Sequence, residues 1–202
     1  TDITQSCALG GLTYGVTNLE ITAAYASISN MGVYTEPVLY SKVVDHDGNV
    51  VIDNTDPTVR QRQIMKPSTA WQLLQALKSV VYAGTGGPAA TRSGIACAGK
   101  TGTTSSNYDL WFCGMTPYYT ASIWMGYDYN ITLYDSSAHK YMWRDIMDQE
   151  KIGKFIANER KEKKQYWIEI DSRYCSDCVD YYHFLLFVEV SSEIGLEDGS
   201  RN

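Results

Sequence analysis

The chain has 202 residues, 44% of them hydrophobic, and a formal net charge of -6 at pH 7. This length and apolar content allow one sizeable hydrophobic core. The acidic balance argues against a nucleic-acid-binding protein, and because no run of 18 or more apolar residues occurs, no membrane-spanning helix is expected here.

The first predicted element is a helix from Thr17 to about Asn30. Thr17-Asn18-Leu19-Glu20 fits a capping box, in which the threonine and glutamate side chains each satisfy a free backbone donor at the helix start. Gly32 is expected to end this helix.

Two strands are predicted between Val33 and Val51. Asp45-His46-Asp47-Gly48-Asn49 has the composition of a hairpin turn and is expected to join them. His46 lies in that turn, so we interpret it as a solvated loop histidine.

A second helix is predicted to follow Pro67 and Ser68. The spacing of its apolar residues predicts a buried stripe made of Trp71, Leu74, Leu77 and Val81. The glycine-rich residues 83–87 are interpreted as the C-terminal cap of this helix and a mobile loop beside the strand predicted at about residues 95–104.

Further strands are predicted over about residues 95–104, 110–115 and 120–127. Only a short link, residues 116–118, separates the last two, so they should form an antiparallel hairpin. Leu110-Trp111-Phe112 is apolar on both faces of its strand, and helices are therefore expected to cover this strand on both sides.

The first of these strands contains a motif with two competing interpretations. Gly94 to Thr101 satisfies G-x-x-x-x-G-K-[ST], a phosphate-binding loop, whereas Lys100-Thr101-Gly102 satisfies the K-T-G element of penicillin-interacting serine enzymes. A phosphate loop joins a strand to a helix N-terminus. Residues 85–93 have loop composition and residues 102–107 would start a helix poorly, so a nucleotide-binding site is disfavoured.

As a strand, this segment has the features of a substrate-binding edge. Small residues such as Gly99 and Gly102 would let a substrate backbone lie against it. Thr101 and Thr103 would present their hydroxyl groups on one face, because strand side chains alternate. An ordinary edge strand with a solvated Lys100 would explain the triplet alone equally well.

Other stretches accompany the triplet in the chain order Gly15–Glu20, Ala23–Tyr34, Asp109–Pro117 and Tyr119–Asp128. Together with the triplet they resemble the transpeptidase domain of class A penicillin-binding proteins, the bifunctional murein synthases, over about residues 8–150. The resemblance implies an α+β fold in which an antiparallel sheet, made of the K-T-G strand and the following hairpin, is covered by helices. This would be an incomplete part of the β-lactamase-like penicillin-binding transpeptidase fold.

The same resemblance implies roles for the residues of the K-T-G strand. Lys100 would supply positive charge near the substrate carboxylate, and Thr101 would hydrogen-bond that carboxylate. The backbone N–H of Thr103 would form one half of an oxyanion hole, a donor typically worth about 3 kcal/mol of barrier. Gly102 would keep the strand flat enough for this approach, and Thr104 would also bind substrate.

In the family, an S-x-x-K serine nucleophile and an S-x-N motif precede K-T-G, and neither occurs before Gly99. Ser137-Ala138-His139-Lys140 and Ser105-Ser106-Asn107 have these spacings but follow Lys100. We interpret Ser105–Asn107 as a turn, and Ser136 or Ser137 as the N-cap of a last helix. The chain is therefore expected to be an internal fragment that lacks the nucleophile and is inactive in isolation.

The implied function is that of a fragment of a peptidoglycan D,D-transpeptidase, which cross-links stem peptides through an acyl-serine intermediate. The expected partners are the D-Ala-D-Ala stem peptide, β-lactams and the remaining N-terminal part of the same domain, at the extracytoplasmic face of the bacterial cell membrane. The alternatives are a serine D,D-carboxypeptidase or β-lactamase relative, a non-catalytic wall-binding module, and a P-loop-like nucleotide binder. No cofactor is expected.

Residues 1–150 are thus predicted to be the C-terminal part of a transpeptidase domain, and residues 151–202 a C-terminal extension of unknown role. Within the extension, the charged residues 151–164 are predicted to form a solvated helix. Residues 181–190 are aromatic and β-prone and could add an edge strand.

The cysteines are odd in number, which argues against a complete disulfide framework. Cys97 and Cys113 fall in predicted strands and are interpreted as small buried hydrophobic residues. Cys175 and Cys178 form a C-x-x-C pair near His183, but a structural zinc site needs about four ligands. A local disulfide is therefore favoured over a metal site.

Overall fold

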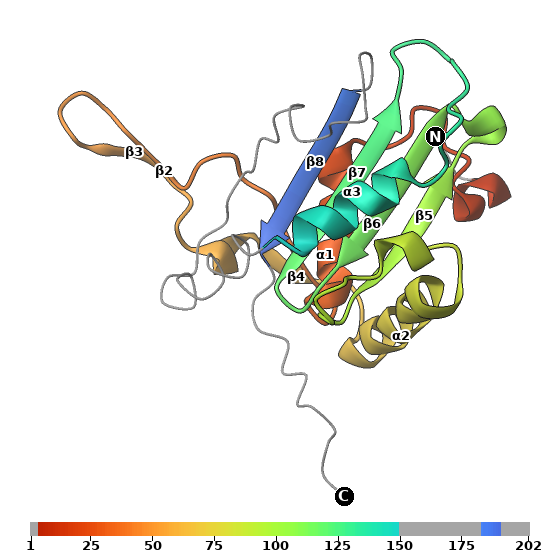
Figure 1. The fold of residues 1–202 in the computed structure, drawn as a ribbon. Coiled ribbons are helices and arrows are strands. Elements are labelled where there is room, and N and C mark those ends of the chain that lie inside the picture. The colour runs from red at the N-terminus through yellow and green to blue at the C-terminus, as the bar shows by residue number, and fades with distance from the viewer. Residues whose placement is uncertain (1–3, 150–182, 191–202) are drawn as a thin grey trace, which may run out of the picture.

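The computed structural model describes residues 4–149 and 183–190, and the fold is that of these residues (Figure 1). The helices are α1 (Asn18–Ser29), α2 (Pro67–Ala83) and α3 (Ala138–Met147). The strands are β1 (Val33–Thr35), β2 (Lys42–Val44), β3 (Val50–Asp53), β4 (Gln61–Gln63), β5 (Ala98–Thr103), β6 (Asp109–Met115), β7 (Tyr119–Gly126) and β8 (His183–Val190). Short 3-10 turns lie at Gln5–Leu9, Pro57–Arg60, Gly87–Ala89 and Ser105–Asn107.

A four-stranded antiparallel sheet in the order β5-β6-β7-β8 forms the centre of the molecule. Strand β5 lies at one edge and pairs with β6, which places Lys100 opposite Cys113 and Thr103 opposite Leu110. Strands β6 and β7 form the predicted hairpin, closed where the Thr116 N–H donates to the carbonyl of Tyr119. The predicted α+β architecture, an antiparallel sheet built from the K-T-G strand and the following hairpin, is confirmed.

The predicted edge strand at the end of the chain is also confirmed, as β8 pairs antiparallel with β7 along its whole length. Because β8 lies beyond residue 150, this part of the extension joins the main sheet. The predicted helix over residues 151–164 lies outside the described residues.

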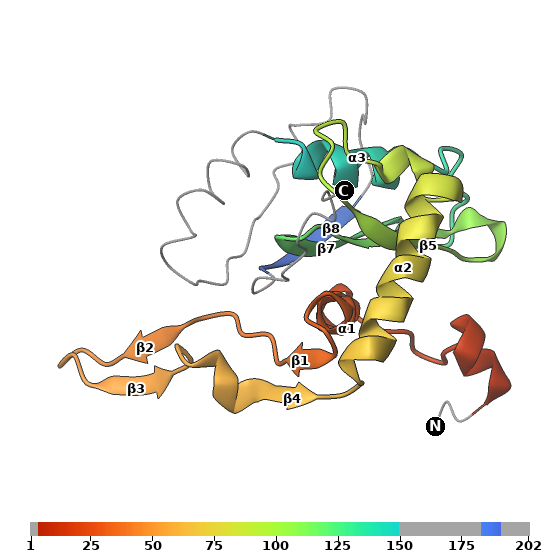
Figure 2. The same ribbon diagram turned by 90° about the horizontal axis from the view of Figure 1, so that it is seen from below.

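Helices cover both faces of the sheet, as expected from the apolar residues of β6. Figure 2 shows α3 on one face, α1 on the other, and α2 passing beside β5. On the α3 face, Phe112 packs against Trp143, and the Trp143 indole N–H donates to the carbonyl of Ala121 at 3.1 Å. Among the described residues, no helix is long and apolar enough to cross a membrane.

The opposite face meets α1 through buried hydroxyl groups. Ser29 and Thr120 place their hydroxyl oxygens 3.2 Å apart, and Thr22 bonds with Ser122. Hydrogen bonding between these side chains compensates for taking them out of water. The helix start is as predicted, because Thr17 and Glu20 form a capping box.

The region between α1 and α2 differs from the prediction. The turn at Asp45–Asn49 joins β2 and β3 as expected, but β1 pairs with β4, a strand that the sequence analysis did not predict. Pro37 explains the early end of β1, because proline lacks a backbone donor and fixes its own φ angle. The residues of β4, Gln-Arg-Gln, carry no apolar signal.

The buried stripe of α2 is also partly different. Leu74, Leu77 and Val81 are buried as predicted, but the first position of the stripe is Ala70 rather than Trp71. The side chain of Trp71 is 49% exposed. A stripe at 70, 74, 77 and 81 keeps the helical spacing, and residue 71 then lies about 100° around the helix.

Candidate functional site

The K-T-G residues lie on β5, at the open edge of the main sheet. Lys100 and Thr103 are exposed, while Thr101 and Gly102 are half-buried. The Lys100 ammonium donates to the carbonyl of Thr101 at 2.8 Å. The predicted residues therefore form one continuous edge, with Thr104 directly after it.

Residues 94–97 lead into β5, which begins at Ala98, three residues later than the predicted start at about residue 95. After β5 the chain makes only the short turn Ser105–Asn107 and enters β6. A phosphate-binding loop requires a helix N-terminus at this point, since the helix supplies the amide donors. The geometry of Lys100 and Thr101 therefore does not fit a phosphate-binding loop.

The backbone N–H and C=O groups of successive β5 residues point alternately toward β6 and toward the open edge of the sheet. Thr104 donates its N–H to the carbonyl of Asp109 at 3.1 Å, which closes the end of the β5–β6 ladder. In an antiparallel ladder, successive residues point their backbone groups in opposite directions. The N–H groups of Thr103 and Thr101 are therefore directed away from β6, toward the open edge.

The hydroxyl of Thr104 has a structural contact within the sheet. It donates to the carboxylate of Asp109 at 3.0 Å and accepts the Asp109 N–H at 2.8 Å. Asp109 in turn accepts the indole N–H of Trp124 at 2.9 Å. These bonds fix the turn that follows Thr103.

The glycines of β5 are explained by close packing on β6. A Cβ at Gly99 would lie 2.6 Å from the ring of Phe112, and one at Gly102 would lie 3.1 Å from the Cβ of Trp111. Contacts below 3.0 Å force neighbouring atoms to move, so Gly99 tolerates no side chain without repacking. A side chain at Gly102 would also crowd its neighbours, but less severely than one at Gly99.

A residue that the sequence analysis did not single out contacts the K-T-G threonine. Thr85 lies in the loop after α2, and its hydroxyl oxygen is 2.9 Å from that of Thr101. The ammonium of Lys140, on α3, donates to the Thr85 carbonyl at 3.4 Å. The glycines on either side of Thr85 were the available signal, since they indicate a tightly folded loop.

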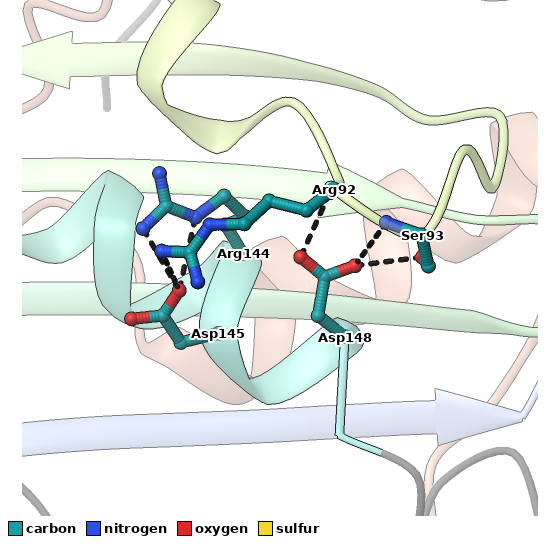
Figure 3. A network of polar contacts seen from close by, with 5 residues as sticks. All are labelled: Arg92, Ser93, Arg144, Asp145 and Asp148. Carbon is teal, nitrogen blue, oxygen red and sulfur yellow. Dashed lines mark hydrogen bonds and ion pairs between the residues drawn. The ribbon is translucent and has the colours of Figure 1, made fainter.

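The same loop is held to the end of α3 by a network of polar contacts (Figure 3). Asp148 accepts the backbone N–H groups of Arg92 at 2.8 Å and Ser93 at 3.1 Å, and the Ser93 hydroxyl at 2.7 Å. Burial opposes ionisation of Asp148, but these hydrogen bonds outweigh it and hold its pKa below the usual value. Asp145 adds ion pairs to Arg92 at 3.0 Å and Arg144 at 2.9 Å.

Of the two later serine motifs, one lies in a turn and the other at a helix start, as predicted, but the expected side-chain cap of Ser137 does not form. Ser105–Asn107 forms a 3-10 turn, in which Ser106 and Asn107 have φ values of 62° and 56°. Ser137 is the N-cap residue of α3, but its side chain makes no capping bond. Asp135, two residues before the N-cap, caps the helix instead, because its carboxylate reaches forward and accepts the N–H groups of Ser137 and Ala138 at 2.8 and 3.1 Å.

His139 lies on α3, against the β6 side of the sheet, with 1% of its surface exposed. Burial lowers its pKa to about 4, and the charge of Lys140 acts in the same direction. Asp135 and the Trp111 backbone oppose this shift. The imidazole is therefore neutral at pH 7.

The cysteines that the structure describes are reduced. Cys97 and Cys113 are buried as predicted, and burial raises the pKa of the Cys113 thiol to about 12. Cys7 is exposed. Cys175 and Cys178 lie outside the described residues. Across residues 4–149 and 183–190, no group of three or more His, Cys, Asp or Glu side chains is placed to hold a metal ion.

Comparisons with known proteins agree with this geometry. Residues 2–148 match the family described as the penicillin binding protein transpeptidase domain. Penicillin-binding protein 1A of Clostridium botulinum strain Langeland is 38% identical over 147 residues, which are 71% of this chain and 17% of the relative. Penicillin-binding protein 1F of Bacillus subtilis is 35% identical over 127 residues, covering 60% of this chain and 17% of the relative.

Solved structures show the same fold. The penicillin-binding protein PonA1 of Mycobacterium tuberculosis matches with a TM-score of 0.55 and 25% identity, over 66% of this chain and 38% of that one. Penicillin-binding protein 1A of Haemophilus influenzae matches in fold with a TM-score of 0.53 and 19% identity, over 90% of this chain and 33% of that one. The chain spans 17% of the length of the curated relatives named here. It belongs to the penicillin-binding protein transpeptidase domain family, in the class A group of the penicillin-binding protein 1A type.

Proposed function

We propose that this chain supplies the K-T-G wall of a serine-type peptidoglycan D,D-transpeptidase. The observation that carries the proposal is the open edge of β5, which carries Lys100, with its ammonium bonded to the Thr101 carbonyl, the Thr101 hydroxyl, and the outward-directed N–H of Thr103. A cation, a hydroxyl and a backbone donor on one strand edge suit an acyl substrate that ends in a carboxylate. The family membership supports the same reaction class.

Each residue of this edge has a proposed role. Lys100 places its positive charge near the substrate carboxylate and the nucleophile, and the Thr101 hydroxyl donates to that carboxylate. The Thr103 N–H donates to the oxyanion of the tetrahedral intermediate, where one such donor is worth about 3 kcal/mol of barrier. Gly102 keeps the strand close to β6, and Thr104 extends the substrate-binding edge.

The proposed reaction proceeds in two acyl-transfer steps. A serine hydroxyl attacks the carbonyl between the two D-Ala residues, and its proton passes to a base. The base gives this proton to the leaving nitrogen as the C–N bond breaks, so that terminal D-Ala leaves as the free amino acid and the acyl group stays on the serine. A neighbouring stem-peptide amine then attacks the acyl-serine ester, which restores the serine. The serine, its S-x-x-K lysine and the S-x-N motif come from the N-terminal part of the domain, so the isolated chain is inactive.

The proposed partners follow from this reaction. They are the D-Ala-D-Ala stem peptide, the rest of the domain, and β-lactams, which would acylate the same serine. PonA1 of M. tuberculosis, a fold relative, has been solved in complex with penicillin V. The proposed reaction takes place at the extracytoplasmic face of the bacterial cell membrane. Residues 151–202 are proposed to be a C-terminal extension of the transpeptidase domain of residues 1–150.

A cross-linking assay tests the proposal. The parent protein, encoded by the complete reading frame, is incubated with a pentapeptide stem and an acceptor amine. We expect cross-linked product and released D-Ala from the parent, and neither from the isolated chain. Release of D-Ala without cross-linked product would indicate a carboxypeptidase instead. A saturable thermal shift with Mg²⁺ and ATP would favour the nucleotide-binding alternative.

A further inference from the structure

We propose that Thr85 is a positioning residue that orients the hydroxyl group of Thr101 toward the substrate carboxylate. This inference rests on the proposed function and adds a residue outside the K-T-G strand to that site. Its basis is the 2.9 Å separation of the two hydroxyl oxygens. Thr85 comes from the loop between α2 and β5, so the contact joins two separate elements.

The chemistry of paired hydroxyl groups determines which of the two threonines donates the hydrogen bond when substrate is bound. A threonine hydroxyl has one proton to donate and two lone pairs that accept. When Thr85 donates to Thr101, the Thr101 proton remains available for an anionic acceptor. A carboxylate accepts hydrogen bonds only, so its binding selects this arrangement. Thr85 then fixes the Thr101 rotamer that donates to the substrate.

The backbone around Thr85 is built to hold it in place. The N–H of Gly86 donates to the carbonyl of Val80 at 2.9 Å, which folds the loop back over the last turn of α2. A Cβ at Gly84 would lie 2.9 Å from the same carbonyl oxygen, and a Cβ at Gly86 would lie 3.1 Å from it. Glycine on both sides of Thr85 permits this close approach.

Contacts on α3 fix the loop from the other side. Lys140 donates to the Thr85 carbonyl at 3.4 Å, and the loop beyond it is held by Ala89, which is fully buried in the core. The hydrogen bonds from Arg92 and Ser93 to Asp148 hold the loop end that leads into β5. These contacts hold the backbone that carries Thr85, and a binding site needs its supporting residues held in this way.

Acylation kinetics of the parent protein test this role. The second-order rate constant for fluorescent penicillin is measured for the wild type, Thr85→Val and Thr85→Ser. We expect a loss of about tenfold for valine, which keeps the shape but removes the hydroxyl, and a loss within about twofold for serine. Thr55→Val is the control, because the Thr55 hydroxyl bonds only locally, to Asp53 on the β2–β3 hairpin, and its acylation rate should not change. Thr85→Ala is measured in parallel in case the valine variant fails to fold.

A comparison of two penicillins separates positioning from a general effect on structure. A penicillin with a free carboxylate should lose rate in Thr85→Val, whereas its methyl ester, which lacks the anion, should react with both proteins at about the same rate. In a Thr101→Val background the Thr85 substitution should have no further effect. Equal losses for acid and ester, or an unchanged rate in Thr85→Val and Thr85→Ala, would overturn the inference. A wild-type parent that takes up no penicillin would instead overturn the proposed function, and this inference with it.

Discussion

Phe112 and Trp143 meet edge to face, with ring centroids 5.2 Å apart and an interplanar angle of 72°. This contact joins the strand next to the K-T-G strand to helix α3, and both side chains are fully buried. Aromatic pairs in this geometry stabilise a fold beyond the area they bury. The contact therefore fixes α3 against the face of the sheet from which Lys140 reaches the Thr85 loop.

The first prediction concerns the two helix tryptophans. Trp143→Ala should lower the free energy of unfolding by about 3–5 kcal/mol, because it leaves a large cavity and removes the hydrogen bond from the indole N–H to the Ala121 carbonyl. Trp71→Ala is the control and should cost less than about 1 kcal/mol, since Trp71 is 49% exposed. Urea unfolding of both variants measures the difference. Similar losses would contradict the burial of Trp143.

The second prediction separates two helix N-caps. Thr17→Ala should destabilise the chain by about 1 kcal/mol, because the Thr17 side chain accepts the Glu20 N–H at 3.2 Å. Ser137→Ala should change stability by less than about 0.5 kcal/mol, as Asp135 makes the capping bonds there. Thermal unfolding of the two variants tests this order. A larger loss in Ser137→Ala would show that the serine hydroxyl caps α3 in solution.

The third prediction concerns pH. His139 has its pKa lowered from 6.5 to about 4 in the folded chain by burial. Between these values the unfolded chain binds a proton that the folded chain does not, so stability should fall as the pH drops from about 6.5 to 4. The loss should approach about 3 kcal/mol. Denaturant unfolding at several pH values measures it.

A His139→Leu variant isolates this contribution. Carboxylates with lowered pKa values, such as Asp148 and Asp45, also lose stabilising bonds in acid, and both proteins share this loss. The difference between wild type and variant should therefore report His139 alone. If the unfolding free energies of the wild type and the variant fall in parallel from pH 6.5 to 4, the prediction that His139 is buried and neutral in the folded chain is wrong.

The fourth prediction compares the two aspartates at the end of α3. Asp148→Ala should release the loop and speed the hydrogen exchange of the Arg92 and Ser93 amides, because both donate to this carboxylate. Asp145→Ala should have little effect on those amides, because its ion pair to Arg92 is largely exposed and such pairs contribute about 0–1 kcal/mol. Amide exchange followed by mass spectrometry distinguishes them. Equal protection in both variants would contradict the role given to Asp148.

The main sheet and α1 were predictable because their signals are local. The capping box at Thr17 and the short link at residues 116–118 each fix one piece of structure from neighbouring residues alone. The buried face of α1 was harder to predict, because hydroxyl side chains such as Thr22 and Ser29 have no hydrophobic periodicity. Their burial depends on partners about a hundred residues away, on β7.

The residues of the candidate site also differ in how far the sequence predicts them. Lys100 to Thr103 could be placed on an edge strand from composition and from the family resemblance. The loop of residues 83–87 lies beside this strand as predicted, but the contact of Thr85 with Thr101 was not predictable, because it arises only when the loop folds back over Val80. The pairing of β1 with β4 was missed for a related reason, since the polar residues of β4 are recognised as a strand only beside their partner.

The central claim is that β5 forms one wall of an acylation cleft whose nucleophile lies elsewhere in the parent protein. Mapping the penicillin adduct on the parent by mass spectrometry tests it most directly. We predict a single acylated serine, in an S-x-x-K sequence that lies outside these 202 residues. An adduct on Ser105, Ser137 or any other residue of this chain would contradict the account.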